Sequence, residues 1–266
     1  MARSFLFAPD NGDVATTRLI STAAQFTGFM KGEPGGERPG WYVPGRDNSA
    51  FLGALHASLA AAFPQAGPAL WAVRMWTNLL WQPAYLSVIA VHIHGAVPDL
   101  RGLSQNRRTI YVDGYRLRPG PLWSGSPETM IERAGAFLRP WTGQLLLEVN
   151  AWEKLRPLPA QRLLADRILS LLVLLAQKRP ELSREAIEAH AQAWLAVLGL
   201  EGQGSLQWLP LEDGRTVPIV SRKGCCLDYL ATPPRFCANC PRQDRNVRLS
   251  RQLAEWGVDQ SNTSSG

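Results

Sequence analysis

All four cysteines of the 266-residue chain lie in one short segment, CCLDYLATPPRFCANCP, which spans residues 225–241. Cys225 and Cys226 are adjacent, ten residues follow, and Cys237 and Cys240 then form a C-x2-C pair. Because a C-x2-C turn directs two sulfur atoms toward one metal, the segment is a candidate site for zinc or for an iron–sulfur cluster. For a chain expected in the reducing cytosol a structural disulfide is disfavoured, and a vicinal redox disulfide is a minor alternative.

The adjacent cysteines distinguish the two metal interpretations. Structural zinc sites are normally built from two pairs of ligands, each pair spaced by about two to four residues. Neighbouring residues rarely reach one tetrahedral ion without strain, whereas a two-iron cluster offers terminal positions on two metals. Pro241 follows the last cysteine, as in the Cys-Pro that closes bacterial ferredoxin motifs. The spacing therefore favours an iron–sulfur cluster, with zinc second and redox-active thiols third.

The positive charge of the chain is concentrated around the cysteines. Residues 215–251 hold eight basic and two acidic side chains, which accounts for the whole net charge of +6. A basic stretch is ordinarily a solvated face, but here it coincides with groups that carry negative charge when they bind iron and sulfide. Positive charge near a cluster favours its reduced form. The candidates for tuning the potential or for binding substrate are Arg222, Lys223, Arg235, Arg242 and Arg245.

The pattern C-C-x10-C-x2-C near the C-terminal end resembles the FhuF-type siderophore-iron reductases, which hold a [2Fe–2S] cluster through this motif. The surrounding SRKGCCLDYLATPPRFCANCPRQ looks like the basic, aromatic C-terminal module of that family. Upstream, the agreement is one of length and helical character. The resemblance implies a [2Fe–2S] cluster whose ligands are Cys225, Cys226, Cys237 and Cys240.

The resemblance also implies an activity, namely cytoplasmic one-electron reduction of Fe(III) held by a siderophore of the hydroxamate class. Hard oxygen ligands hold Fe(III) tightly, and one added electron lowers the charge of the metal so that Fe(II) is released. The expected partners are a ferric siderophore and an electron donor of the ferredoxin, flavodoxin or flavin-reductase type. No nucleic acid is expected, and contact with the inner membrane would be peripheral at most.

Two other functions stay open at this point. One is a zinc-stabilised nucleic-acid-binding protein that uses the basic segment for phosphate contacts, although only Tyr229 and Phe236 are available there for base stacking. The other is a non-catalytic siderophore-binding protein whose cluster is structural. The metal content of the purified protein would distinguish the zinc protein from the reductase. The kinetics of electron transfer to a ferric siderophore would distinguish the siderophore-binding protein from the reductase.

Upstream of the cysteines the sequence predicts a mainly helical domain. The first fifty residues look irregular, with a Gly- and Pro-rich loop over residues 32–48. The segment of residues 84–97 is compatible with either a buried helix or a strand. Proline, capping and hydrophobic-periodicity signals predict helices over residues 49–63, 68–81, 127–138, 141–154, 160–178 and 184–198.

Two short hairpins complete the predicted fold. One covers Thr109–Leu117 with its turn at Asp113-Gly114, and the other turns at Asp213-Gly214. We expect an α+β protein that is mainly α-helical. Its parts are a helical siderophore-binding domain (1–204) that contains the first hairpin, a small C-terminal iron–sulfur module (205–256) that contains the second, and a disordered tail (257–266). Neither a signal peptide nor a membrane span is expected.

Trp71 and Arg74 are candidates for binding a bulky chelate, because indole faces and guanidinium groups suit such ligands. Trp76 and Trp81 follow at similar spacing, and core packing is the competing interpretation for these tryptophans.

The four histidines offer little for chemistry. His92 and His94 would lie on one face of a strand, where a packed or hydrogen-bonded role is favoured over a metal site. His56 and His190 are isolated in helical patterns and receive no role.

Overall fold

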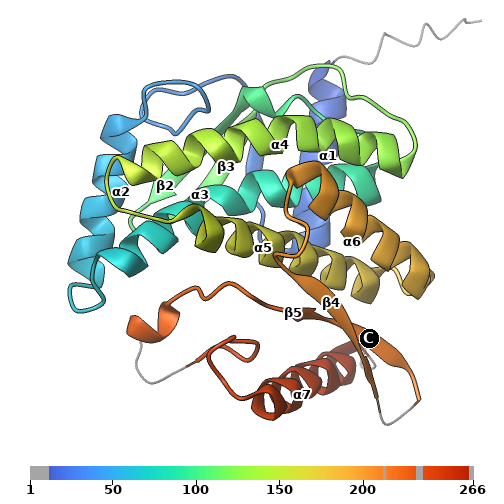
Figure 1. Cartoon of the computed structure of the whole chain (residues 1–266). Helices are drawn as coiled ribbons and strands as arrows, with labels where there is room; N and C mark the ends of the chain where they lie inside the picture. Colours follow the sequence, from blue (N-terminus) through green and yellow to red (C-terminus); the bar gives the residue numbers. More distant parts are fainter. Residues whose placement is uncertain (1–11, 212–213, 232–235, 264–266) are drawn as a thin grey trace, which may run out of the picture.

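The computed structural model describes residues 12–211, 214–231 and 236–263. It is an α+β protein in which helices predominate, as the sequence predicts (Figure 1). The N-terminal part contains α1 (Gly12–Thr27), β1 (Gly32–Pro34), α2 (Ser49–Ala62), α3 (Pro68–Ile89), η1 (Ala90–His94), η2 (Leu100–Gly102), β2 (Leu103–Arg108), β3 (Tyr111–Leu117), α4 (Pro127–Asn150), α5 (Pro157–Lys178) and α6 (Arg184–Leu198). The C-terminal part contains β4 (Ser205–Pro210), β5 (Thr216–Ser221), η3 (Asp228–Leu230) and α7 (Arg245–Thr263).

Helix α3 forms the centre of the helical domain and packs against α2, α4 and α5 (Figure 1). The apolar stripe predicted on α5 is confirmed, since Leu164, Ile168 and Leu172 are all buried. Helix α6 begins and ends as predicted. The hydroxyl of Ser183 accepts a hydrogen bond from the amide of Ala186 at 3.2 Å, and Gly199 ends the helix in a left-handed conformation.

Two predicted helix ends are wrong because a proline lies inside each helix. Helix α3 continues through Pro83 to Ile89, and α4 continues through Pro140 to Asn150, where the sequence predicts two shorter helices. A proline inside a helix leaves the carbonyl four residues earlier without its usual donor. At Pro83 this carbonyl belongs to Leu79, and the buried side chain of Gln105 donates to it at 3.0 Å. A tertiary contact thus replaces the lost helical bond.

Strands β1, β3 and β2 form a three-stranded sheet with β3 in the middle. Strands β2 and β3 are antiparallel, but their turn precedes Tyr111, so the predicted turn at Asp113-Gly114 is wrong. Their register shifts beside Gly114, where β3 has one residue more than β2. Gly114 has φ +85°, and a glycine with positive φ is typical of such a β-bulge. Asp113-Gly114 therefore forms a β-bulge within β3 and not the turn of a hairpin.

The N-terminal region is more regular than the sequence predicts. Helix α1 packs against β1 and α3, and it buries Leu19 and Ala23 on one face. Of the two alternatives left open for residues 84–97, the structure has the helix and not the strand. Both histidines lie in η1, a π-helical turn that continues α3.

The C-terminal part begins with the predicted hairpin, because β4 and β5 pair in antiparallel register. Residues 212–213 of its turn lie outside the described residues. Strand β5 packs against α5 (Figure 1), and its Val220 belongs to the same hydrophobic core as the apolar residues of α5. Helix α7 continues to Thr263, so that part of the tail predicted to be disordered from residue 257 is helical. Among the described helices, none combines the length and apolar character needed to cross a membrane.

Candidate metal centre

The four cysteines lie in the irregular segment between β5 and α7 (Figure 1). Cys237 and Cys240 form a tight turn in which the amide of Cys240 donates to the carbonyl of Cys237 at 3.1 Å. The side chain of Gln243 supports this turn by donating to the same carbonyl at 2.6 Å. Cys240 is buried, whereas Cys225, Cys226 and Cys237 are partly exposed. The thiols are therefore close to the surface but fixed by the local backbone.

The structure brings the thiols together as two pairs. Cys226 interacts electrostatically with Cys237, and Cys225 interacts with Cys240 and with Cys226. The interaction with Cys237 lowers the pKa of Cys226 to about 6. The same interaction raises the pKa of Cys237, and burial raises that of Cys225. Two neighbouring thiol pairs are the donor set that the two irons of a [2Fe–2S] cluster require.

Within the described part of the chain, no three His, Cys, Asp or Glu side chains are grouped as a site for one metal ion. The cofactor therefore stays a prediction from the sequence.

Arg222 connects the cysteines to helix α5. Its Nη1 lies 3.6 Å from Sγ of Cys237 and 3.1 Å from Oδ1 of Asn239. Its Nε donates to Oδ2 of Asp166 on α5 at 3.1 Å. Asp166 is only 4% exposed, and the same oxygen accepts a second bond from the amide of Gly224 at 3.0 Å. Arg222 is thus the predicted basic residue that the structure places against a cysteine sulfur.

Arg222 and Asp166 each favour the charged form of the other. Burial raises the pKa of Asp166, and Arg222 and the amide of Gly224 oppose that rise. Burial alone would lower the pKa of Arg222, but Asp166, Cys226 and Cys237 raise it above its ordinary value. The guanidinium is therefore charged at all ordinary pH values and lies between a buried carboxylate and the cysteines.

Gly224 allows the cysteine segment to approach α5 closely. A Cβ atom at this position would lie 2.8 Å from Oδ2 of Asp166 and 3.1 Å from the α5 backbone at Arg162 and Leu163. Any larger side chain would push the segment away from the helix, and the distance between Arg222 and Cys237 would change with it.

Arg242 belongs to an aromatic cluster beside the cysteines. Its guanidinium lies 4.7 Å from the ring centroid of Tyr229 and donates to the hydroxyl of that residue. The ring of Tyr229 packs against Phe236 at 5.3 Å. In this arrangement Arg242 stabilises the loop and has no contact with a cysteine sulfur among the described residues.

The other predicted basic residues are less informative. Lys223 donates to the backbone carbonyl of Gly202 at 2.7 Å. Arg245 is exposed at the start of α7. Arg235 lies outside the described residues.

A cavity of about 300 Å³ opens beside Cys226 and Cys237, where α3, α5 and the cysteine segment meet. Arg222 and Asp166 also line it, so the cavity includes the ion pair described above. On its α3 side, Arg74 forms an ion pair with Asp228, with 3.0 Å between Nε and Oδ1. We call this space the inner cavity.

The structure separates the tryptophans that the sequence groups together. Trp81 lines the inner cavity, as does the predicted residue Arg74. Trp76 is buried in the core. The predicted residue Trp71 lies away from the cavity, and its indole N–H donates to the carbonyl of Phe63 at 3.0 Å.

Sequence reasoning missed Asn78 and Arg167, which also line the inner cavity. Arg74, Asn78 and Trp81 have the four- and three-residue spacing that places side chains on one face of a helix. A signal was therefore present within the predicted helix of residues 68–81. The contribution of α5, through Asp166 and Arg167, has no local signal because it depends on packing.

The histidines are packed residues, as favoured from the sequence. The indole N–H of Trp194 donates to Nε2 of His92 at 2.9 Å, and the rings of His92 and His190 are 4.5 Å apart. Burial lowers the pKa of His92 to about 3, so its ring is neutral. His94 shares a hydrogen bond of 3.1 Å with the hydroxyl of Thr22.

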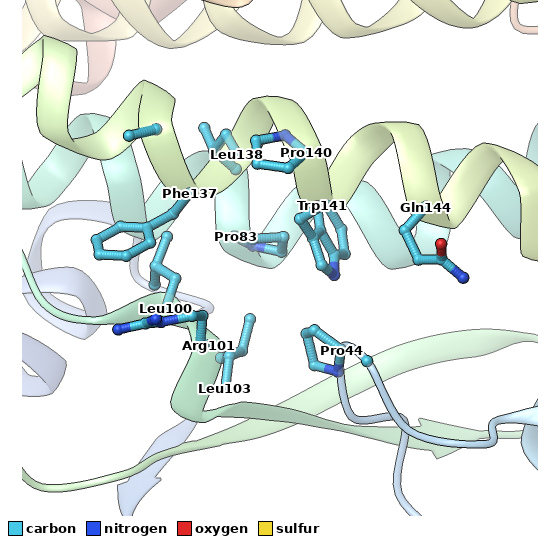
Figure 2. A pocket seen from close by; sticks show the side chains of 12 residues that line it. Pro44, Pro83, Leu100, Arg101, Leu103, Phe137, Leu138, Pro140, Trp141 and Gln144 are labelled. Atoms are coloured by element: carbon cyan, nitrogen blue, oxygen red, sulfur yellow. The ribbon is translucent and has the colours of Figure 1, made fainter.

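A separate apolar cavity of about 350 Å³ lies beside the two prolines within helices, as Figure 2 shows for Pro83, Pro140, Leu103, Phe137 and Trp141. No cysteine lines it, and it contains little that could carry redox chemistry. We therefore place the candidate site at the inner cavity.

No protein-family model matches the chain. The functional assignment therefore depends on the chemistry of the cysteine segment and of the residues around it.

Proposed function

We propose that the protein is a cytoplasmic ferric-siderophore reductase with a [2Fe–2S] cluster bound by Cys225, Cys226, Cys237 and Cys240. Its substrate is a ferric siderophore, of the hydroxamate class that the resemblance to FhuF-type reductases implies. The observation that carries the proposal is the position of two of the four thiols, Cys226 and Cys237, on a cavity that is also lined by arginines. Any contact with the inner membrane is peripheral.

The donor set suits this cofactor. Cys240 is buried and the other three thiols are partly exposed, so a cluster held here has one sheltered side and one side near solvent. When bound, a [2Fe–2S] cluster supplies one-electron transfer between an external donor and the ferric ion. The electron donor is a protein of the ferredoxin, flavodoxin or flavin-reductase type.

Arg222 and Asp166 would adjust the reduction potential of a bound cluster. Arg222 would lie next to the negative charge that a bound cluster gains on reduction, because its Nη1 is 3.6 Å from Sγ of Cys237. Because this guanidinium is positive and partly desolvated, it stabilises the reduced form more than the oxidised form. Asp166 holds Arg222 in position from α5. The ferric ion accepts the electron, and the chain needs neither a nucleophile nor a general base.

The first experiment is metal analysis of the purified protein. We expect a red-brown preparation with about two irons and two sulfides per chain and a paramagnetic signal after one-electron reduction. Cys226→Ser should abolish the signal. A colourless protein with one zinc and no sulfide would overturn the proposal and favour the zinc-stabilised nucleic-acid-binding alternative.

The second experiment tests catalysis. The reduced protein is mixed with a ferric trihydroxamate, and Fe(II) is trapped by a chromogenic chelator while the visible spectrum reports reoxidation. We expect one Fe(II) per oxidised cluster. If ferricyanide reoxidises the cluster but the ferric chelate does not, the protein is a non-catalytic siderophore-binding protein with a structural cluster.

A further inference from the structure

A second hollow adjoins the inner cavity on the side away from the cysteines. Its volume is about 760 Å³, and we call it the outer hollow. Asn78 and Trp81 line both spaces, so their side chains form the boundary between them. The two volumes are within the range of roughly 300–1,000 Å³ that pockets for drug-sized ligands occupy.

Exposed aromatic rings line the outer hollow. Phe29 is 50% exposed and Tyr111 is 53% exposed, although both are large apolar side chains. The ring of Phe29 lies 5.9 Å from that of Trp81, and Trp81 lies 5.7 Å from Tyr85. Clustered aromatic surface that stays open to solvent in a concave site marks a ligand-binding site more often than a folding defect.

The boundary residues are fixed in place. The side-chain Nδ2 of Asn78 donates to the carbonyl of Ile110 at 2.8 Å, and the indole N–H of Trp81 donates to the carbonyl of Val112 at 3.0 Å. Helix α3 is thereby attached to the β2–β3 sheet at the floor of the hollow. A ligand would meet a wall that is already formed, which lowers the entropy cost of binding.

The charged side chains of the two spaces leave an excess of positive charge, whereas a cluster on Cys226 and Cys237 would add negative charge at the cysteine end of the inner cavity. Lys31 lies 3.9 Å from Asp113, and in the inner cavity Arg74 and Arg222 each have a carboxylate partner. Arg108 in the outer hollow and Arg167 in the inner cavity have no carboxylate partner among the described residues. Arg167 instead lies 5.9 Å from the ring centroid of Tyr85.

We propose that the outer hollow, together with the inner cavity, is the docking site of the ferric chelate, and that Arg108 and Arg167 make it prefer neutral and anionic chelates over cationic ones. This inference rests on the proposed reductase function. The aromatic rings contact the organic part of the chelate, and Trp81, which lines both spaces, contacts it where they meet.

The test uses a ligand series that varies only in charge. The probes are gallium(III) complexes of one linear trihydroxamate whose terminal amine is free, acetylated or succinylated, with net charges of about +1, 0 and −1 at neutral pH. Gallium(III) has the charge and ligand preference of Fe(III) but does not take up the electron. Binding is measured by calorimetry on the purified full chain, at low and at high salt.

We expect the affinity to rise by about tenfold from the cationic to the anionic complex at low salt. High salt should reduce this difference, because both arginines are accessible to solvent. In the double variant Arg108→Gln/Arg167→Gln the three affinities should agree within about threefold. The matched control is Arg139→Gln/Arg156→Gln, which removes the same charge from exposed positions that line neither space and should keep the preference.

A second pair of variants tests the aromatic wall. Phe29→Ala and Tyr111→Ala remove exposed rings, so folding should be preserved, and each should weaken binding of all three complexes by about tenfold. The charge preference should remain in both. Trp152→Ala provides a control, because Trp152 is also an exposed aromatic residue but lines neither space.

The outcomes separate the docking site from the reductase function. If the wild type binds the gallium complexes in the expected order but does not reduce the iron complexes, the docking site stands and the proposed function fails. If the wild type reduces the iron complexes but the variants in the outer hollow bind as the wild type does, the docking site is wrong and the reductase stands. Absence of binding of all three complexes to the wild type would also overturn the docking site.

Discussion

Arg222 contacts both a cysteine sulfur and a buried carboxylate, with 3.6 Å to Cys237 and 3.1 Å to Asp166. A charged hydrogen bond of this kind favours whichever redox state carries more negative charge. Of the basic residues around the cysteines, Arg222 therefore has the geometry to set the redox potential. Arg242 has a similar position in the sequence but stacks on Tyr229.

Arg222→Gln should lower the reduction potential of the proposed cluster by roughly 30–60 mV, since about 59 mV corresponds to a tenfold change in a one-electron equilibrium. The physical reason is the loss of a positive charge and a donor beside Cys237. Potentiometric titration followed by the visible spectrum measures the shift. Arg242→Gln is the matched control, because it removes the same charge without touching a sulfur, and its shift should be much smaller. Equal shifts in the two variants would show that the potential depends on the net charge of the chain and not on the contact between Arg222 and Cys237.

Among the elements, α5 fixes the cysteine segment through one buried ion pair. The side chains of Arg222 and Asp166 are only 13% and 5% exposed. Removing one member of such a pair leaves the other charge buried without a partner, whereas removing both avoids this cost.

Asp166→Asn should therefore destabilise the cluster-free protein by about 3 kcal/mol, and Arg222→Gln by a similar amount. The double variant should be less destabilised than the sum of the two single variants, by about 1–3 kcal/mol. Urea unfolding of all four proteins gives this coupling energy. Additive effects would show that Asp166 and Arg222 act independently, and the assigned role of Asp166 in holding Arg222 would then be wrong.

Another element-level feature is the bulge in β3. Gly114 has φ +85°, and nothing except Asn106 and a carbonyl of Lys31 is near its Cβ position, at 3.7 Å and 4.0 Å. Gly114→Ala should cost about 1 kcal/mol of stability through backbone strain alone. Gly143→Ala is the control, because Gly143 lies within α4 with open space around it. This second change should stabilise the protein by about 0.5–1 kcal/mol. If both variants changed the free energy of unfolding equally, Gly114 would not be required for the β-bulge.

At the scale of the whole molecule, His92 makes the free energy of unfolding sensitive to acid pH. Its pKa is lowered to about 3 in the folded protein from an ordinary value of 6.5. The unfolded chain therefore takes up a proton at this residue first, and the corresponding stability is lost as the pH falls from about 6.5 toward 3. His190 and Trp194 face the ring, and Arg179 donates to the His92 carbonyl at 3.4 Å.

His92→Gln retains an acceptor for Trp194 and removes the titrating group. The free energy of unfolding should then fall less steeply below pH 6.5, by up to about 1.4 kcal/mol per pH unit. Urea unfolding at pH 7.0, 6.0, 5.0 and 4.5 provides the comparison. An unchanged slope would show that His92 does not stay neutral in the fold.

Much of the architecture could be predicted from local signals. Ser183 and Gly199 delimit α6 as expected, and the apolar stripe of α5 is buried. The predictions failed where a residue distant in the sequence alters the structure that the local residues favour. Pro83 does not end α3 because Gln105 bonds to the freed carbonyl, and Asp113-Gly114 is a bulge because β2 pairs on both sides of it.

The sequence by itself determined which groups can do chemistry. The spacing of the four cysteines and the basic residues among them are local facts of the chain, and they predict a redox centre before any contact is known. Residue type and spacing suffice for this, since a ligand set is defined by which donors a short loop carries.

Only the tertiary structure decided how those groups are arranged. It brought Cys226 near Cys237, and it placed Arg222, one of several basic residues, against the sulfur of Cys237. It also brought Trp81, Asp166 and Arg167 to the same cavity from two helices far apart in the sequence. The physical reason is that a cavity and a buried ion pair exist only between packed elements, and no single segment encodes the packing of another.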